Sequence, residues 1–297
     1  MDKIFGSKYA KTIGMIAISM MMTVSCVQDN TSRTTDSGDT ANISDVKDTK
    51  SVNAAPTIRK AIPFVGEFSQ ITNMGSPNIV FTEGECSIVA EGPEILVNHV
   101  KVSVDSGSLI VTLNTENNHD VNMFERSAAG LTLYISAPQL RIVSTCSTGN
   151  FTAHGKLKVE DFIVGTLAQG NIEIDTLECS NSFRYEGKSE ANARFGYITV
   201  DGTAEVISDG TGNFDADMNV NGKLMLNMNG VGNTSVSGKA SEVEVLAFNQ
   251  STANLTMNLS GNLSVSAYDQ SNVTFSGTYK SKQVHKNSSS NVTISGK

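Results

Sequence analysis

From residue 146 onward, short runs of alternating apolar and polar residues recur about every 20 residues. Each run opens with a small residue and an asparagine, followed by an apolar, a polar and another apolar residue, as in Gly149-Asn150-Phe151-Thr152-Ala153. An alternation with a period of two predicts a β-strand that buries one face. The asparagines of this pattern stand 18 to 21 residues apart: Asn150, Asn171, Asn192, Asn213, Asn233, Asn254, Asn272 and Asn291.

A second strand is predicted in each repeat from the residues that precede the next asparagine. Apolar residues stand seven and nine positions before it, as Val164 and Phe162 do before Asn171, until Lys282 breaks the series. No repeat of this length can bury its apolar face alone, whereas stacked repeats bury a continuous core. We therefore expect an all-β fold, with a parallel β-solenoid of coils of about 20 residues over 146–297.

The recurring asparagines have a structural interpretation and a ligand-binding one. Asparagine tolerates the left-handed backbone of a sharp corner, and a small residue before it lets neighbouring coils approach closely. Asparagine side chains stacked from coil to coil also form hydrogen-bonded ladders. A structural Asn ladder is therefore the role expected at all eight positions.

The segment 57–145 has a less regular pattern, with clear alternation at 109–113 and 131–135. Between these runs, residues 114–129 form a long Asn-, Glu- and His-containing loop, and loops of this length are functional or mobile. We expect 57–145 to form an N-terminal β region and cap, continuous with the solenoid. A solenoid without a cap would expose unpaired strand edges.

The N-terminus has the pattern of an export signal. Three lysines precede an apolar run over 13–24 that is too short to span a bilayer. The run ends in Thr23-Val24-Ser25-Cys26, which resembles the lipobox of bacterial lipoproteins. That resemblance implies a signal peptide over 1–25 and an acylated Cys26 that holds the protein at a membrane, and the alternative is an ordinary secretory signal. Residues 26–56, rich in Ser, Thr, Asp and Asn, would then be the acylated Cys and a flexible tether.

The net charge of the chain argues against nucleic-acid binding and against electrostatic attachment to a membrane. The formal net charge of −8 offers no basic face to nucleic acid. Loss of 1–25 would remove three Lys and one Asp, which makes the remaining chain more acidic still. Electrostatic attraction would not hold such a chain at an anionic lipid surface, so the lipid on Cys26 must be the anchor.

Metal and cofactor chemistry has little support in the sequence. The four histidines stand far apart along the chain, so we expect no metal site and no cofactor. Three cysteines remain after cleavage, and an odd number leaves at least one free thiol. We expect small buried apolar residues at these positions, with a disulfide to Cys86 left open: Cys86, Cys146 and Cys179.

The repeat resembles a bacterial family of unknown function that is common in Bacteroidetes, the putative auto-transporter adhesin head GIN domain family. Three segments match its glycine-rich turn before an alternating strand best: 147–150, 210–213 and 230–233. Three upstream segments resemble its opening strand, its Gly-x-Leu strand and its Pro-x-Leu entry to the coils: 64–71, 106–111 and 136–140.

The resemblance would cover residues 62–297, although the coils with Ser271 and Ser290 in place of glycine depart from its pattern. It implies a right-handed β-helix-like fold and a location in the cell envelope. The adhesin name by itself implies no activity, because one fold supports many functions.

Two outward carboxylates are the weak candidates for catalysis. Glu173, Arg194 and Asp215 hold the same place in three successive repeats. Two coils separate Glu173 from Asp215, or about 10 Å, which is close to the separation in inverting glycosidases. Cross-strand charge pairing on a solvated sheet explains such a column more simply.

The sequence thus favours an outer-membrane lipoprotein, periplasmic or surface-exposed, that presents a β-solenoid for adhesion or partner binding without catalysis. Its ligand would be a glycan or a protein, and the absence of Trp counts against an aromatic glycan platform. One alternative is a polysaccharide-acting β-helix enzyme, of the hydrolase or lyase type. Another is a structural scaffold that recognises a protein partner through its sheet edge.

Overall fold

The structure is a computed structural model that describes residues 56–114 and 130–297. The predicted signal peptide (1–25), Cys26, nearly all of the tether (26–56) and nearly all of the loop 114–129 lie outside the described residues. The chain divides into two units, Met1–Thr49 and Lys50–Lys297, and all described residues belong to the second.

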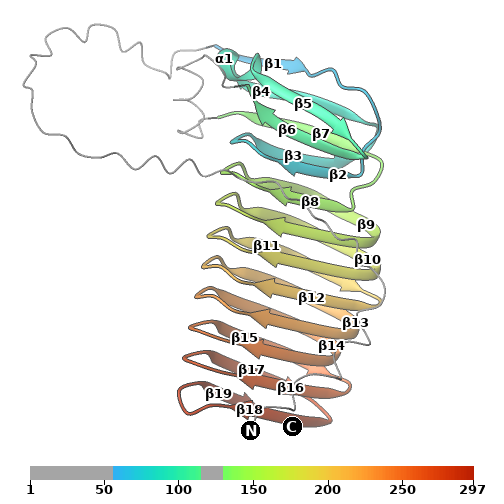
Figure 1. Ribbon diagram of the computed structural model, residues 1–297. Coiled ribbons are helices and arrows are strands. Elements are labelled where there is room, and N and C mark those ends of the chain that lie inside the picture. The colour runs from blue at the N-terminus through green and yellow to red at the C-terminus, as the bar shows by residue number, and fades with distance from the viewer. Residues whose placement is uncertain (1–55, 115–129) are drawn as a thin grey trace, which may run out of the picture. The chain divides into compact units, whose positions relative to one another are not determined.

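The expected all-β solenoid is confirmed, with about eight turns of roughly 20 residues each (Figure 1). Every coil contributes a strand to each of two faces. Face 1 holds the strands that follow the small-residue turns, and face 2 holds the strands that precede the next turn. Four long strands bend at a corner and serve both faces: β9 (Phe151–Thr166), β10 (Ile172–Gly187), β13 (Phe214–Met228) and β14 (Asn233–Ala247).

The remaining coils have separate strands on the two faces, and all of them pair in parallel with their neighbours. On face 1 these are β11 (Ala193–Val200), β15 (Thr252–Leu259), β17 (Asn272–Thr278) and β19 (Asn291–Ser295). On face 2 they are β12 (Thr203–Ser208), β16 (Asn262–Ala267) and β18 (Ser281–Lys286).

The first coils are stacked in an order that differs from the order of the sequence. On face 1, β3 (Asn78–Glu83) lies between β7 (Thr132–Ala137) and β9. On face 2, β2 (Gln70–Asn73) lies between β6 (Ser108–Leu113) and β8 (Ile142–Thr145). The β2–β3 segment therefore fills a layer whose neighbours on both sides come from later parts of the chain.

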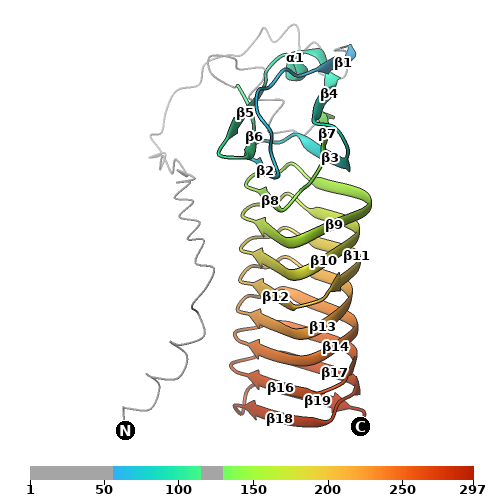
Figure 2. The ribbon, with the colours of Figure 1, turned by 90° about the vertical axis from the view of Figure 1, so that its right-hand side faces the viewer.

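Antiparallel strands cover the N-terminal end of this stack (Figure 2). On face 1, β4 (Ser87–Pro93) pairs with β7, and β1 (Thr57–Ala61) pairs with β4. On face 2, β5 (Val100–Asp105) pairs with β6. The short helix α1 (Glu94–Val97) connects β4 to β5 and buries Leu96 and Val97.

The opening strand expected at 64–71 is wrong in its position. Strand β1 ends at Ala61 and β2 begins only at Gln70. The residues between them lead from the outermost strand of face 1 to a strand inside face 2, so they cannot pair with one strand neighbour throughout. Phe68 in this connection is nevertheless buried, so the crossing contributes to the core.

One apolar core runs through the coils, from Ile62 near the N-terminal cap to Phe275 in β17. The inward residue of every second strand position supplies it, as the alternation in the sequence predicts. Aromatic rings from successive coils meet inside it, with ring centroids 5.3 Å apart for Phe183 and Phe195 and 5.6 Å apart for Phe195 and Phe214. Stacked coils therefore share a single core rather than a series of small ones.

Candidate functional site

An asparagine ladder runs along one corner of the coils. In each step the backbone N–H and the side-chain Nδ2 of one asparagine donate to Oδ1 of the asparagine one coil before it. For Asn171 and Asn150 these distances are 2.9 and 3.1 Å. Five of the eight predicted positions are joined in this way: Asn150, Asn171, Asn192, Asn213 and Asn233.

The ladder begins one layer earlier than the sequence indicates. Asn78 Oδ1 accepts from Asn150 Nδ2 at 3.0 Å, because β3 lies beside β9. Asn78 stands 72 residues before Asn150, so a repeat of about 20 residues carries no signal for it.

The placement of Asn254 in this column is wrong by two residues. Thr252 is the residue that stands beside Asn233, and Asn254 lies between Ser235 and Thr274 on the outside of face 1. Asn272 and Asn291 follow Thr252 in register. The spacings gave a signal: the steps of 21 and 18 residues on either side of Asn254 become 19 and 20 when Thr252 takes its place.

From Asn150 onward, a small residue precedes each ladder position because the coils approach closely there. A Cβ atom on Gly212 would lie 1.8 Å from the carbonyl oxygen of Ala191. In the last turns, serines fill the place and are buried: Ser271 Oγ donates to the Ala247 carbonyl at 3.3 Å, and Ser290 Oγ donates to the Ala267 carbonyl at 2.9 Å. The turns that depart from the glycine pattern are therefore as closely packed as the others.

A second polar column, which the sequence reasoning missed, follows the opposite corner. Asn181 Nδ2 donates to Asp161 Oδ1 at 2.8 Å, and Asn221 Nδ2 donates to Asp201 Oδ1 at 2.9 Å. In the sequence, this column is marked by an Asp or Glu that is followed about 20 residues later by an Asn. Both corners thus use their amides for contacts between coils.

The candidate carboxylates Glu173 and Asp215 stand in one outward column on face 1, with Arg194 between them in register. All three side chains are exposed. Neither carboxylate lines either of the two hollows characterised in the described residues. The structure therefore brings the three residues into line but does not enclose them.

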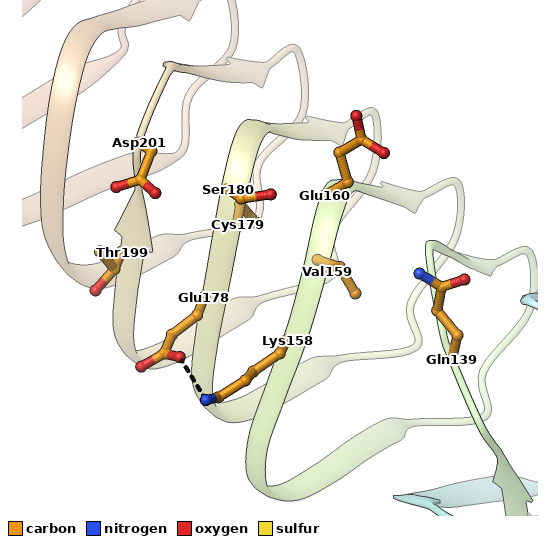
Figure 3. A pocket seen from close by; sticks show the side chains of 9 residues that line it. All are labelled: Gln139, Lys158, Val159, Glu160, Glu178, Cys179, Ser180, Thr199 and Asp201. Atoms are coloured by element: carbon orange, nitrogen blue, oxygen red, sulfur yellow. Dashed lines mark ion pairs between the residues drawn. The ribbon is translucent and has the colours of Figure 1, made fainter.

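A shallow hollow of about 400 Å³ lies at the corner of β9, β10 and β11 (Figure 3). Its acidic residues include Glu178, whose Oε1 accepts a hydrogen bond from Lys156 Nζ at 2.5 Å and whose Oε2 lies 3.6 Å from Lys158 Nζ. The bond from Lys156 lowers the pKa of Glu178. A carboxylate held ionised in this way does not suit the role of a general acid at neutral pH.

The thiol of Cys179 lies in the wall of the same hollow and is buried. Burial raises its pKa to about 12, and the nearby charge of Asp161 adds to the shift. The thiol is therefore protonated at neutral pH and is not a nucleophile. Cys86 and Cys179 are free thiols, and the expectation that all three cysteines are buried is wrong, because Cys86 and Cys146 lie in connections and are half-buried.

Two kinds of feature are absent from the described ranges. Among residues 56–114 and 130–297, no group of three or more His, Cys, Asp and Glu side chains is arranged to hold a metal ion. The same ranges contain no helix with the length and apolar character needed to cross a membrane.

The outward side chains differ between the two faces. On face 2, from β9 to β16, they are half-buried and mix aliphatic residues with ion pairs, such as Lys223 with Glu244 and Arg184 with Glu205. On face 1, the strands from β14 to β19 carry two exposed columns without charge. We name these columns the hydroxyl–amide array: Ser235, Asn254, Thr274 and Thr293, and beside them Ser237, Thr256, Ser276 and Ser295.

Comparison with known proteins gives a family and a set of similar folds. Residues 67–194 match the family described as putative auto-transporter adhesin, head GIN domain. A putative adhesin from Parabacteroides merdae ATCC 43184 is 14% identical, with a TM-score of 0.57, over 82% of this chain and 98% of that one. A putative adhesin from Parabacteroides distasonis ATCC 8503 is 12% identical, with a TM-score of 0.62, over 81% of this chain and 98% of that one.

A third solved structure, a putative lipid binding protein from the same Parabacteroides distasonis strain, is 16% identical, with a TM-score of 0.52, over 81% of this chain and 97% of that one. No curated protein matches the chain. At such low identities the likeness to the three structures shows a shared fold and nothing finer. The family match covers less of the chain than the segment 62–297 expected from the turns, and over residues 67–194 it confirms the resemblance to the putative auto-transporter adhesin, head GIN domain family.

Proposed function

We propose that this protein is an adhesin-like binding protein of the cell envelope, a lipoprotein attached to the outer membrane through an acylated Cys26 after loss of the signal peptide 1–25. It binds an extended partner without catalysis. The family supports the adhesin-like role, and the lipobox-like Thr23-Val24-Ser25-Cys26 supports the anchor.

The observation that carries the proposal is the hydroxyl–amide array on face 1. Its eight side chains are all exposed, carry no charge and repeat in register from strand to strand. Parallel strands lie about 4.8 Å apart, so hydroxyl and amide groups recur at that interval along the face. Such a surface can hydrogen-bond along a chain of neutral sugars, and we therefore propose a neutral polysaccharide as the partner.

Paired variants of a single coil test the use of this face. Asn254→Arg with Thr256→Arg places two large charged side chains in the array, and Ser264→Arg with Ser266→Arg places the same groups on face 2 of the same coil. All four positions point outward, so both proteins should fold. The measurement is binding of the full chain to immobilised neutral polysaccharides.

The proposal predicts at least a tenfold loss of binding for the face 1 variant and an unchanged affinity for the face 2 variant. Equal losses in both variants, or no binding by the unaltered chain, would contradict it. If the chain instead binds a protein, and the face 1 variant loses that binding, then face 1 is the binding surface but its partner is a protein and not a polysaccharide.

The anchor is tested by metabolic labelling with an alkyne fatty acid in cells that produce the protein. Label should enter the unaltered protein and be absent from Cys26→Ser, while Cys86→Ser should label normally. Label in the Cys26→Ser protein, or none in either, would contradict the lipoprotein assignment.

The enzyme hypothesis is tested on the same polysaccharides by assaying released oligosaccharides. We expect no release. Release that disappears in Glu173→Gln or Asp215→Asn would overturn the non-catalytic assignment and make these two outward carboxylates the catalytic pair.

A further inference from the structure

The last described strand of face 2 carries charge where the coil before it carries apolar side chains. In register, Lys282 stands beside Leu263, Val284 beside Val265 and Lys286 beside Ala267. The partners in β16 are buried in the core, whereas all six residues of β18 are exposed. Two lysines and a valine therefore face the open end of the core.

The surroundings of these lysines are basic. Residues 270–297 contain four lysines, at 280, 282, 286 and 297, and no Asp or Glu. The whole chain has a formal charge of −8, so the rest of it, residues 1–269, carries −12. Lys282 Nζ lies 5.6 Å from the centre of the Tyr279 ring, which holds this ammonium group at the end of the coils.

The same end presents strand edges. In the described chain, β18 pairs with β16 and β19 pairs with β17, and no other described strand is in register with either. The outer edge of β18 therefore offers backbone N–H and C=O groups in the pattern that an added strand can use.

We infer that β18 is a docking edge for an acidic β-strand of another protein, one whose inward side chains follow the order acid, apolar, acid. Such a strand would extend face 2 by one layer. Its two carboxylates would meet Lys282 and Lys286, and its apolar residue would cover Val284.

Charge complementarity favours this occupant over a second copy of the chain. Two C-terminal ends brought together would oppose lysines to lysines, and like charges directly opposite each other destabilise a sheet. The outer strands at the other end, β1 and β5, carry Arg59, Lys60 and Lys101 but only one acid, Asp105, so the N-terminal end of a second copy would also meet β18 with like charge. The lysines of β18 would thus repel a second copy and attract an acidic strand.

This inference is independent of the proposed function, because it concerns face 2 and the end of the coils and not the hydroxyl–amide array. The test uses the full chain and a fluorescein-labelled peptide, Thr-Glu-Thr-Val-Thr-Glu-Thr, with binding measured by fluorescence anisotropy. The inward pattern of this peptide is the same in both directions, so it can pair in parallel or antiparallel. Thr-Lys-Thr-Val-Thr-Lys-Thr serves as the control for charge, and the acidic peptide with N-methylated backbone amides as the control for strand pairing.

We expect the acidic peptide to bind, the lysine peptide not to bind, and N-methylation to weaken binding at least tenfold. Lys282→Gln with Lys286→Gln should also weaken binding at least tenfold. Lys101→Gln with Lys239→Gln, which removes two exposed lysines elsewhere, should leave binding unchanged.

Three results would overturn the inference: equal binding of the N-methylated peptide, unchanged binding in the Lys282/Lys286 variant, or no binding of the acidic peptide at all. Equal binding of the N-methylated peptide, together with competition by dextran sulfate, would show that the lysines bind anions in general, including acidic polysaccharides, without strand pairing. Circular dichroism spectra of both lysine variants check that the fold is intact.

Discussion

The two ends of the solenoid differ in how their unpaired strand edges are protected. A stack of parallel strands has an unpaired edge at each end, and exposed edges invite association. At the N-terminal end the chain reverses direction, and β4, β1 and β5 cover the stack with antiparallel strands. At the C-terminal end the last described strand of face 2 remains parallel and carries lysines at core positions.

We call the N-terminal end, whose strand edges are covered by antiparallel strands, the sealed end, and the C-terminal end, whose edge carries lysines, the guarded end. Ile88 in β4 is 2% exposed and faces the shared core, whereas Val284 in β18 is 39% exposed. Covering an edge with strands removes it from use, but guarding it with charge leaves it available to a partner of opposite charge. We therefore expect the two ends to differ in partner binding as well as in stability.

The largest effect is expected from placing an acid at each end in turn. Ile88→Asp would bury a carboxylate in the cap and should cost at least about 4 kcal/mol of unfolding free energy, enough to disorder the cap. Val284→Asp leaves its carboxylate in solvent beside Lys282 and Lys286, so we expect a change within about 1 kcal/mol. Urea unfolding followed by circular dichroism measures both, and equal losses would remove the distinction between the ends.

The next effect concerns association. Lys282→Leu with Lys286→Leu turns the guarded end into an apolar edge, and we expect the molar mass measured by light scattering to rise with protein concentration. The matched variant Lys101→Leu with Lys239→Leu should remain at its original mass. A Lys282/Lys286 variant that stays at the unaltered mass at all concentrations would show that these lysines do not guard the edge.

A smaller effect separates the middle of the Asn ladder from its last coil. Asn192 donates to Asn171 Oδ1 from Nδ2 at 3.0 Å and accepts from Asn213 Nδ2 at 2.8 Å. Asn192→Ala should therefore cost about 2 kcal/mol, while Asn291→Ala, in the exposed last coil, should cost less than about 0.5 kcal/mol. Urea midpoints of the two variants give the comparison, and a reversed order would contradict a stabilising ladder.

The smallest effect is a gain in stability. The hydroxyl of Thr234 is buried without a hydrogen-bond partner in the described structure, at a column position where its register neighbours are Phe214 and Ala253. Thr234→Val removes that unsatisfied group and should stabilise the fold by about 1 kcal/mol. Thr252→Val, whose side chain is only half-buried, should change stability less, and a loss in Thr234→Val would mean that the hydroxyl has a partner.

The regular coils could be predicted from the sequence because their pairing is local. Each strand lies beside the one about 20 residues later, so the alternation and the spacing carry the register. The prediction failed at Asn254 where residue identity was given more weight than spacing. Thr252 keeps the spacing and occupies the ladder position without being asparagine.

The first layers could not be predicted in the same way. Strand β3 pairs with residues about 72 positions later, and no sequence period connects Asn78 with Asn150. The sequence indicated the charged end only in part. Lys282 interrupts the apolar series, but only its register with Leu263 in the structure shows that this lysine occupies a core-facing position. The polar column at the opposite corner was missed because acid and amide alternate there, so no single residue type repeats.

Hydrogen–deuterium exchange of the full chain, with and without the peptide Thr-Glu-Thr-Val-Thr-Glu-Thr, tests the contrast between the ends most directly. Without peptide, amides of β4 and β7 should exchange slowly and those of β18 quickly. With peptide, protection should appear in β18 and leave the N-terminal cap unchanged. Equal protection at both ends without peptide, or no change in β18 when peptide is added, would contradict a sealed end opposite a guarded, available one.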